Sequence, residues 1–263
     1  MLPLPSRVVV ARGEDPFKLV ERGLKHFEKP TQHRVVVKPN LIIDEPPPTT
    51  TPCDTIEALI RYYLEEGYEV IVAEGSGWCE TSKAFRKLGY TKLAQEYGVK
   101  LVDLNTDRYE LVANPSALYL KRFEKPLTLK DAYIISAPVL KEHSITQVTI
   151  SLKNMLGATL GEKAKVAKKG RFHRKLDESI VDINMYLKPQ LAVVDARTAG
   201  IRGELKSTPL KLGVMLFSSD LVAADSIAST LLGKNPLKIG HIKLAQKAGL
   251  GTADPTKIKV DYI

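Results

Sequence analysis

Residues 132–157 read AYIISAPVLKEHSITQVTISLKNMLG, and they join a long apolar run to a dense group of polar side chains. Residues 132–140 are nearly all apolar, which predicts a buried strand. In residues 145–152, isoleucine, valine and leucine are set among threonine, glutamine and serine, so a second strand is expected there. The stretch therefore predicts a pair of strands with a polar segment between them.

Side chains suited to binding anions follow both of these predicted strands. Lys141 and His143 come directly after the first strand, and Lys153 and Asn154 come after the second. Their N–H groups, together with the hydroxyl groups between them, can bind a phosphate or a carboxylate. The same residues could equally form the solvated face of a strand pair, and this stretch by itself does not decide between the two.

Predicted strands and helices alternate along the rest of the chain. Short valine-rich runs predict strands, and apolar residues at helical spacing between them predict helices. This alternation favours an α/β fold with a mainly parallel, doubly wound sheet and helices on both faces. No domain-breaking linker is found, so residues 1–263 are expected to form a single domain, in which edge hairpins at 109–127 can form a small subdomain. The other expected strands are 7–11, 34–37, 69–73, 100–104, 191–196 and 211–217.

The composition favours a small anionic ligand. The 263 residues include 39 basic and 30 acidic side chains, a net charge of +9, which suits anionic partners. Aromatic residues make up only 6% of the chain, and neither zinc-finger spacing nor an RNA-binding aromatic motif occurs. A small phosphorylated substrate therefore fits the sequence better than nucleic acid does.

The sequence also bears on location and on cysteine chemistry. No stretch reaches ~18 consecutive apolar residues and the N-terminus lacks a signal-peptide pattern, so we expect a cytoplasmic protein with no membrane partner. Cys53 and Cys79 are too few for an iron–sulfur cluster or an all-cysteine zinc site, and they are either free thiols or one disulfide. The sequence is also compatible with a homo-oligomer. The abundance of lysine, glutamate, isoleucine and valine is typical of thermophilic proteins.

Charged side chains lie where several predicted strands end. Lys38 and Asn40 follow a strand, and Pro39 between them ends its hydrogen-bond ladder. Glu74 and Asp195 end two further strands. Because the carboxyl ends of parallel strands line the ligand crevice in open α/β sheets, we expect these residues to meet.

The segment between Asn40 and the next helix is rich in proline and threonine. Residues 44–51 predict a lid or rim beside the crevice. Thr51 is expected to cap the following helix, with Pro52 at its first position.

Asp225 lies on the apolar stripe of a predicted helix, residues 221–232, four positions after Leu221 and three before Ala228. An ionised carboxylate there is costly unless it is paired or bound to a cation. We therefore expect Asp225 either to form a buried salt bridge or to bind a metal ion. With Glu74 and Asp195, Asp225 would form an all-oxygen site, which selects hard ions such as Mg²⁺ or Mn²⁺.

Together these motifs resemble the DUF362 family of archaeal and bacterial proteins, whose function is obscure. Many family members carry an appended ferredoxin-like module; this chain lacks it, so the electron-transfer role that the module implies does not carry over. Gly203-Glu204 stands where the family often shows Gly-Pro, which leaves the role of that loop open. The resemblance runs from about Val8 to about Gly251 and is carried by Lys38-Pro39-Asn40-Leu41, Glu74-Gly75-Ser76-Gly77, Lys141-Glu142-His143, Lys153-Asn154, His173, Val194-Asp195-Ala196 and residues 219–225.

These observations favour a divalent-metal-dependent hydrolase of phosphate esters. Mn²⁺ or Mg²⁺ would polarise the phosphoryl group and lower the pKa of a bound water, and lysines would balance the phosphate charge. His143 or His173 would protonate the leaving group. The expected catalytic residues are His143, Lys141 and Lys153, and the expected anion-binding residues are Lys38, Asn40, Asn154 and His173.

Two other functions fit the same residues. One is a protein that binds a metal ion or an anionic metabolite without turnover. The other is an accessory in cofactor or iron–sulfur assembly, with the missing module supplied by a partner. The hydrolase is the leading hypothesis of the three, and the sequence chooses neither its substrate nor between Mg²⁺ and Mn²⁺.

Overall fold

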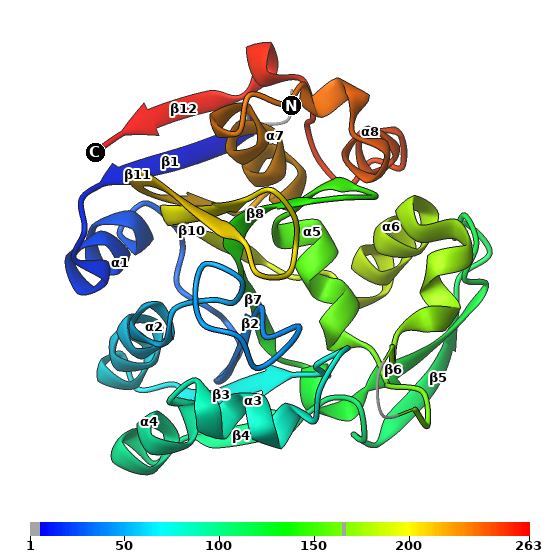
Figure 1. The fold of residues 1–263 in the computed structure, drawn as a ribbon, viewed down its shortest axis with the longest axis horizontal. Coiled ribbons are helices and arrows are strands. Elements are labelled where there is room, and N and C mark those ends of the chain that lie inside the picture. The colour runs from blue at the N-terminus through cyan, green and yellow to red at the C-terminus, as the bar shows by residue number, and fades with distance from the viewer. Residues whose placement is uncertain (1–5, 165–166) are drawn as a thin grey trace.

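A ten-stranded sheet forms the centre of the computed structural model, which describes residues 6–164 and 167–263 (Figure 1). Its main path has the order β12-β1-β11-β10-β7-β2-β3-β4. β11 is antiparallel to both of its neighbours, and the other pairs on this path are parallel. The predicted α/β fold with a mainly parallel sheet is therefore confirmed. The strands of the main path are β1 (Arg7–Arg12), β2 (Arg34–Pro39), β3 (Glu69–Glu74), β4 (Lys100–Asp103), β7 (Tyr133–Ala137), β10 (Leu191–Ile201), β11 (Thr208–Ser218) and β12 (Lys259–Tyr262).

Helices cover both faces of this sheet, as the alternating pattern predicts (Figure 1). Successive strand residues point to opposite faces, so Val35 packs with one helix layer and Val36 with the other. The first layer holds α1 (Pro16–Leu24), α2 (Cys53–Glu65), α3 (Thr81–Lys87) and α4 (Tyr90–Tyr97). The second holds α5 (Ser151–Asn154), α6 (Leu176–Leu187), α7 (Leu221–Leu231) and α8 (Gly240–Lys247).

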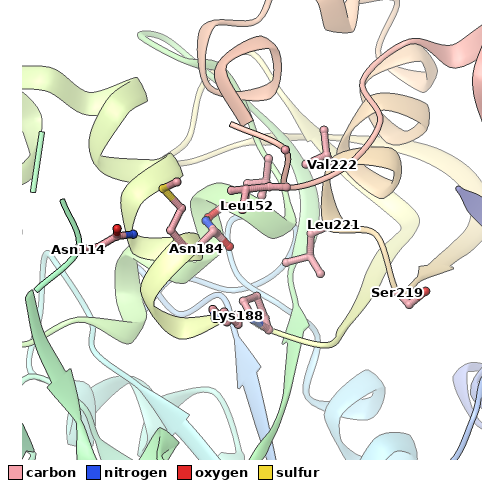
Figure 2. Close-up of a pocket in the computed structure, with 11 residues that line it drawn as sticks. Asn114, Leu152, Asn184, Lys188, Ser219, Leu221 and Val222 are labelled. Atoms are coloured by element: carbon pink, nitrogen blue, oxygen red, sulfur yellow. The ribbon is translucent and has the colours of Figure 1, made fainter. Parts of the chain in front are cut away.

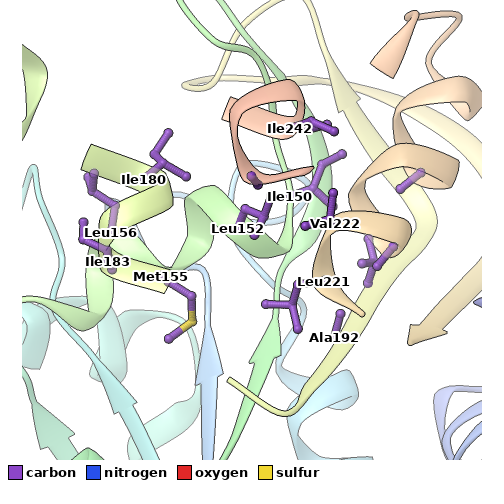
Figure 3. Close-up of a cluster of buried hydrophobic side chains, with 14 of the residues drawn as sticks. Ile150, Leu152, Met155, Leu156, Ile180, Ile183, Ala192, Leu221, Val222 and Ile242 are labelled. Carbon is purple, nitrogen blue, oxygen red and sulfur yellow. The ribbon is translucent and has the colours of Figure 1, made fainter. Parts of the chain in front are cut away.

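The second layer buries a continuous apolar cluster against the sheet (Figure 3). Leu152 of the short helix α5 lies between α7 and α6, where Val222 and Ile180 approach it. Ile242 of α8 lies over the same cluster. This packing holds α5 rigidly against the end of the sheet, although the helix has only four residues.

The predicted strand at 132–140 is divided at Pro138. β7 ends at Ala137, and β8 (Val139–His143) continues in a new direction beside β10 and β9 (Gln147–Thr149). A proline has no N–H to donate to a ladder, so the chain changes partners there. The second predicted strand, 145–152, is correspondingly short, since its last residues begin α5.

Side-chain caps begin α1 and α7, and one predicted cap is wrong. Asp15 accepts hydrogen bonds from the N–H groups of Phe17 and Lys18 at the start of α1, and Asp220 accepts from Ala223 N–H at the start of α7. Thr51 makes no such bond, because its hydroxyl donates to the carbonyl of Ala137 and accepts from the N–H of Asn40. Thr51 therefore ties the end of β7 to the end of β2.

The hairpin expected at 109–127 is a separate two-stranded sheet, β5 (Tyr109–Ala113) with β6 (Arg122–Pro126). It packs on α6, where Phe123 stacks on Tyr186 with ring centroids 4.9 Å apart. Cys53 and Cys79 are both free thiols. Within the described parts of the chain, no helix has the length and apolar character needed to cross a membrane.

Candidate anion-binding site

A small cavity of about 30 Å³ lies at the carboxyl ends of β2 and β3, between β8 and α5. Four lysines and two glutamates line it, so its wall carries an excess of positive charge. All four lysines are buried, although lysine is almost never fully buried without a partner. The lining residues are Lys38, Asn40, Ile42, Glu74, Gly75, Lys141, Thr149, Lys153, Asn154, Leu156, Gly157, Lys169 and Glu204.

Lys38 and Glu74 form a buried ion pair across the ends of β2 and β3. Lys38 Nζ lies 2.7 Å from Glu74 Oε1 and donates to Asn154 Oδ1 at 3.0 Å. Glu74 also accepts hydrogen bonds from the N–H groups of Leu41 at 2.7 Å and Gly75 at 2.8 Å. Burial lowers the pKa of Lys38, and the charge of Glu74 opposes that shift. Both charges are thus well partnered, which makes this pair a structural element of the cavity wall.

Gly157 lies against this pair. A Cβ atom at Gly157 would lie 2.3 Å from Glu74 Oε1 and 2.7 Å from Lys38 Nζ, closer than real contacts allow. A side chain at Gly157 would therefore force the ends of the Lys38 and Glu74 side chains to move.

A buried hydrogen bond joins His143 to Glu204 on the other side of the cavity. Glu204 Oε2 lies 2.6 Å from His143 Nε2. His143 Nδ1 accepts from the N–H groups of Ile145 at 3.0 Å and Thr146 at 3.2 Å, so Nε2 carries the proton and donates to Glu204. Burial lowers the pKa of His143. Burial would raise the pKa of Glu204, but the hydrogen bond from His143 and the charge of Lys153 bring it down to about 2.

The remaining lysines carry ammonium groups with fewer partners. Lys141 Nζ donates to the carbonyls of Thr49 at 2.7 Å and Glu204 at 3.2 Å, and Lys169 Nζ donates to the carbonyl of Thr159. Within the described chain, Lys153 Nζ has only the 3.8 Å ion pair with Glu204 Oε2, which is too long for a hydrogen bond. Burial lowers the pKa of Lys153 to about 8 and, more strongly, those of Lys141 and Lys169 to about 7.

The structure brings together most of the predicted anion-binding residues. Lys38, Asn40, Lys141, Lys153 and Asn154 all line the cavity. The two predicted histidines lie outside the cavity lining. His143 is behind Glu204, and His173 lines an adjoining cavity of about 180 Å³.

Sequence reasoning missed Lys169 and Glu204 as members of the site. Lys169 belongs to the basic segment 161–175, which is typical of a solvated loop, yet its side chain is 3% exposed. Lys168 N–H donates to the carbonyl of Gly77, which holds this segment against the turn after β3. In the sequence, Glu204 stands out only as a departure from the family pattern. Only its position opposite His143 and Lys153 shows that it belongs to the cavity.

The three carboxylates expected to share a cation have different partners. Glu74 is paired with Lys38, and Asp195 is paired with Arg197 Nη2 at 2.8 Å while it accepts from the Thr55 hydroxyl. Two strands, β7 and β2, separate β10 from β3, which places the backbones of Asp195 and Glu74 about 14 Å apart.

Asp225 lies on the other face of the sheet from Asp195. It accepts hydrogen bonds from the N–H groups of Ser151 at 2.8 Å and Leu152 at 3.0 Å at the start of α5, whereas Asp195 faces α2. Burial raises the pKa of Asp225 to about 7, and the two N–H groups oppose the shift. Across residues 6–164 and 167–263, no group of three or more His, Cys, Asp or Glu side chains is placed to hold one metal ion. Glu74, Asp195 and Asp225 therefore do not fit a single cation, and within the described chain Asp225 is satisfied by backbone N–H groups rather than by a charged side chain.

Replacing Asp225 with asparagine is expected to lower the free energy of unfolding by about 1–3 kcal/mol in chelator-treated buffer. An amide offers one acceptor oxygen to two N–H donors, so one buried donor at the start of α5 loses its partner. Urea unfolding followed by circular dichroism measures the change, with Asp131→Asn at an exposed site as the matched control. Equal stability of variant and wild type, with a loss of metal affinity alone, would instead support a metal at Asp225.

A larger cavity, about 380 Å³, has no lining residue in common with the lysine cavity in the described chain (Figure 2). Leu152, Asn184, Leu221 and Val222 line it, together with Lys188 just before β10 and Ser219 just after β11. These last two residues mark the amino end of β10, whereas the lysine cavity lies at the carboxyl ends of the parallel strands. Its wall shows mainly apolar groups, so the concentrated charge of the smaller cavity marks the better candidate site.

Comparison with known proteins shows the family of this chain. The family model described as a domain of unknown function (DUF362) matches residues 35–230, a range that contains every charged residue of the cavity. A thylakoid-associated protein of Synechocystis sp. strain PCC 6803 is 24% identical over 246 residues, which cover 91% of this chain and 74% of that protein. The chain therefore belongs to the DUF362 family.

Proposed function

We propose that the chain binds a small phosphorylated metabolite through the cavity formed by Lys38, Lys141, Lys153 and Lys169. The observation that carries this proposal is Lys153, a buried ammonium with no hydrogen-bond acceptor among the described residues. Burying a charge without a full set of hydrogen bonds is costly. An anionic oxygen in the cavity would supply the missing acceptor.

The charge balance of the cavity supports an anion rather than a cation. Among the described residues that line the cavity, the four lysines face two carboxylates, Glu74 and Glu204, and each glutamate already accepts from other donors. Thr149 Oγ1 also lies in the cavity wall, buried and without a hydrogen-bond partner in the described chain, and its hydroxyl could donate to a phosphate oxygen. Such a site resembles the charge-assisted phosphate sites that lysine commonly forms.

We propose in addition that the site hydrolyses a phosphate ester. Lys141, with a pKa of about 7, could transfer a proton near neutral pH. Mn²⁺ or Mg²⁺ would supply Lewis-acid chemistry if it entered with the phosphate, but no residue is assigned as its ligand. A screen of phosphate monoesters with and without these ions separates a hydrolase from a binding protein. The cytoplasmic location expected from the sequence is also a proposal; the Synechocystis relative is described as thylakoid-associated.

Phosphate affinity is expected to fall about tenfold or more between pH 6.5 and pH 9. The pKa values of Lys141 and Lys169, about 7, and of Lys153, about 8, are lowered by burial. As pH rises through these values the lysines become neutral and no longer attract the anion. Calorimetric titration of chelator-treated protein with inorganic phosphate measures the trend, and chloride at equal ionic strength is the control.

The pH dependence of ester hydrolysis and that of phosphate binding report on different groups. If a metal-bound hydroxide limits the reaction, ester hydrolysis should rise with pH over the same interval. If lysine ammonium groups provide most of the attraction for the anion, phosphate binding should weaken as the pH rises. Phosphate affinity that stays constant from pH 6.5 to 9 would argue against the lysine site.

A further inference from the structure

The anion cavity opens beside a second, more apolar cavity of about 180 Å³. The two cavities share Ile42, Lys153, Leu156, Lys169 and Glu204 in their walls. Lys153 and Lys169 therefore lie at the junction between a charged compartment and a compartment that contains Trp78. We call the second compartment the tryptophan chamber; its remaining lining residues are Gly77, Trp78, Ala167, Gly170 and His173.

Main-chain contacts build the wall of the tryptophan chamber. The N–H of Trp78 donates to the carbonyl of Ile42 at 3.0 Å, which joins the turn after β3 to the segment after β2. Lys168 N–H donates to the carbonyl of Gly77 at 3.1 Å, and Lys168 Nζ donates to the carbonyl of Cys79 at 3.0 Å. Three separate chain segments are thus fixed around Trp78, so the chamber is formed before any ligand enters.

Trp78 is one of the exposed large apolar residues of the described chain. Its side chain is 41% exposed, although it belongs to a wall that also contains Ile42 and Leu156. An exposed indole beside aliphatic side chains and two lysines provides a surface on which an aromatic ring can stack. A cavity of ~150 Å³ with apolar walls can hold one benzene molecule, so the tryptophan chamber has room for a group of that size.

We propose that the ligand of this site has two parts, a phosphate head in the lysine cavity and a single aromatic ring in the tryptophan chamber. This inference rests on the proposed function, because it assigns the lysine cavity to the phosphate. The shared position of Lys153 and Lys169 requires the ring to be attached close to the phosphate. The substrate class is therefore an aryl or arylalkyl phosphate.

Three ligands test the inference by calorimetry on the full chain at pH 7. Inorganic phosphate carries the head alone, glycerol phosphate adds a polar tail, and phenyl phosphate adds a ring. Phenyl phosphate is expected to bind about tenfold more tightly than either of the others, because the ring removes apolar surface from water. Equal affinities for all three would overturn the two-part ligand but leave the phosphate site intact, whereas no binding of any ligand would overturn the proposed function itself.

Trp78→Ala locates the ring. In this variant the ratio of the affinity for phenyl phosphate to that for inorganic phosphate is expected to fall from about ten to about one. The control Tyr262→Ala replaces an exposed aromatic residue of β12 and should keep the tenfold ratio. Trp78 is the only tryptophan, so its fluorescence in the wild type provides a second measurement that needs no variant. A blue shift with phenyl phosphate but not with phosphate is expected. An undiminished advantage in Trp78→Ala, or no spectral change on saturation with phenyl phosphate, would place the ring elsewhere.

Discussion

Replacing Lys38 with methionine is expected to lower the free energy of unfolding by about 3–5 kcal/mol. The exposed fractions of the Lys38 and Glu74 side chains are 1% and 2%, so removal of the ammonium leaves a carboxylate deep in the protein without its cation. Methionine has a similar length and keeps the packing, which isolates the effect of the charge. Guanidinium unfolding in phosphate-free buffer measures the loss.

Two further variants make this experiment specific. Lys29→Met removes the lysine of an exposed pair with Glu66 and should change stability little, because surface pairs are screened by solvent. The double variant Lys38→Met/Glu74→Gln should recover much of the lost stability, since it leaves no unpaired buried charge. A single Lys38→Met variant as stable as the wild type would show that the pair does not form.

Replacing Lys153 with methionine is expected to weaken phosphate binding by at least about thirtyfold. Truncating one partner of a buried, charged hydrogen bond costs about 2 kcal/mol or more, which corresponds to that factor. The fold should survive, because Glu204 keeps its 2.6 Å contact with His143 when Lys153 is absent. The two replacements therefore have opposite signatures: Lys38→Met mainly affects stability, and Lys153→Met mainly affects binding.

Calorimetric titration with inorganic phosphate at pH 7 measures the loss of affinity in Lys153→Met. Lys130→Met, an exposed lysine paired with Glu110, is the matched control and should bind phosphate as the wild type does. Wild-type affinity in Lys153→Met would remove this lysine from the site and would leave the proposed function without its main support.

Local sequence patterns were sufficient to predict the layered fold and much of the cavity wall. Alternating apolar runs identify the strands, and the residues that follow a parallel strand meet at one edge of the sheet. The sequence therefore predicts that Lys38 and Asn40 after β2 and Lys141 in β8 lie beside Lys153. This inference needed only the direction of the strands, which the βα alternation indicates.

The partners of the charged residues depended on the tertiary structure. The apolar stripe of α7 showed that Asp225 needs donors, but the N–H groups that satisfy it come from Ser151 and Leu152, distant in sequence. Asp195 and Glu74 both end strands, yet the order of the strands between them keeps them apart. Strand order arises from long-range pairing, which periodicity within one segment does not encode.

Two loop residues show most clearly the difference between what local patterns predict and what long-range contacts determine. Lys169 and Glu204 belong to segments without apolar periodicity, so their sequence indicates solvent exposure, while the folded chain buries one and half-buries the other beside the lysine cavity. Their burial follows from contacts with remote segments, such as the hydrogen bond from Lys168 to Gly77 and that from His143 to Glu204. Local patterns identify the polar residues that end the strands. The opposite charges that face them could not be predicted, because they lie on loops whose path is set by long-range packing.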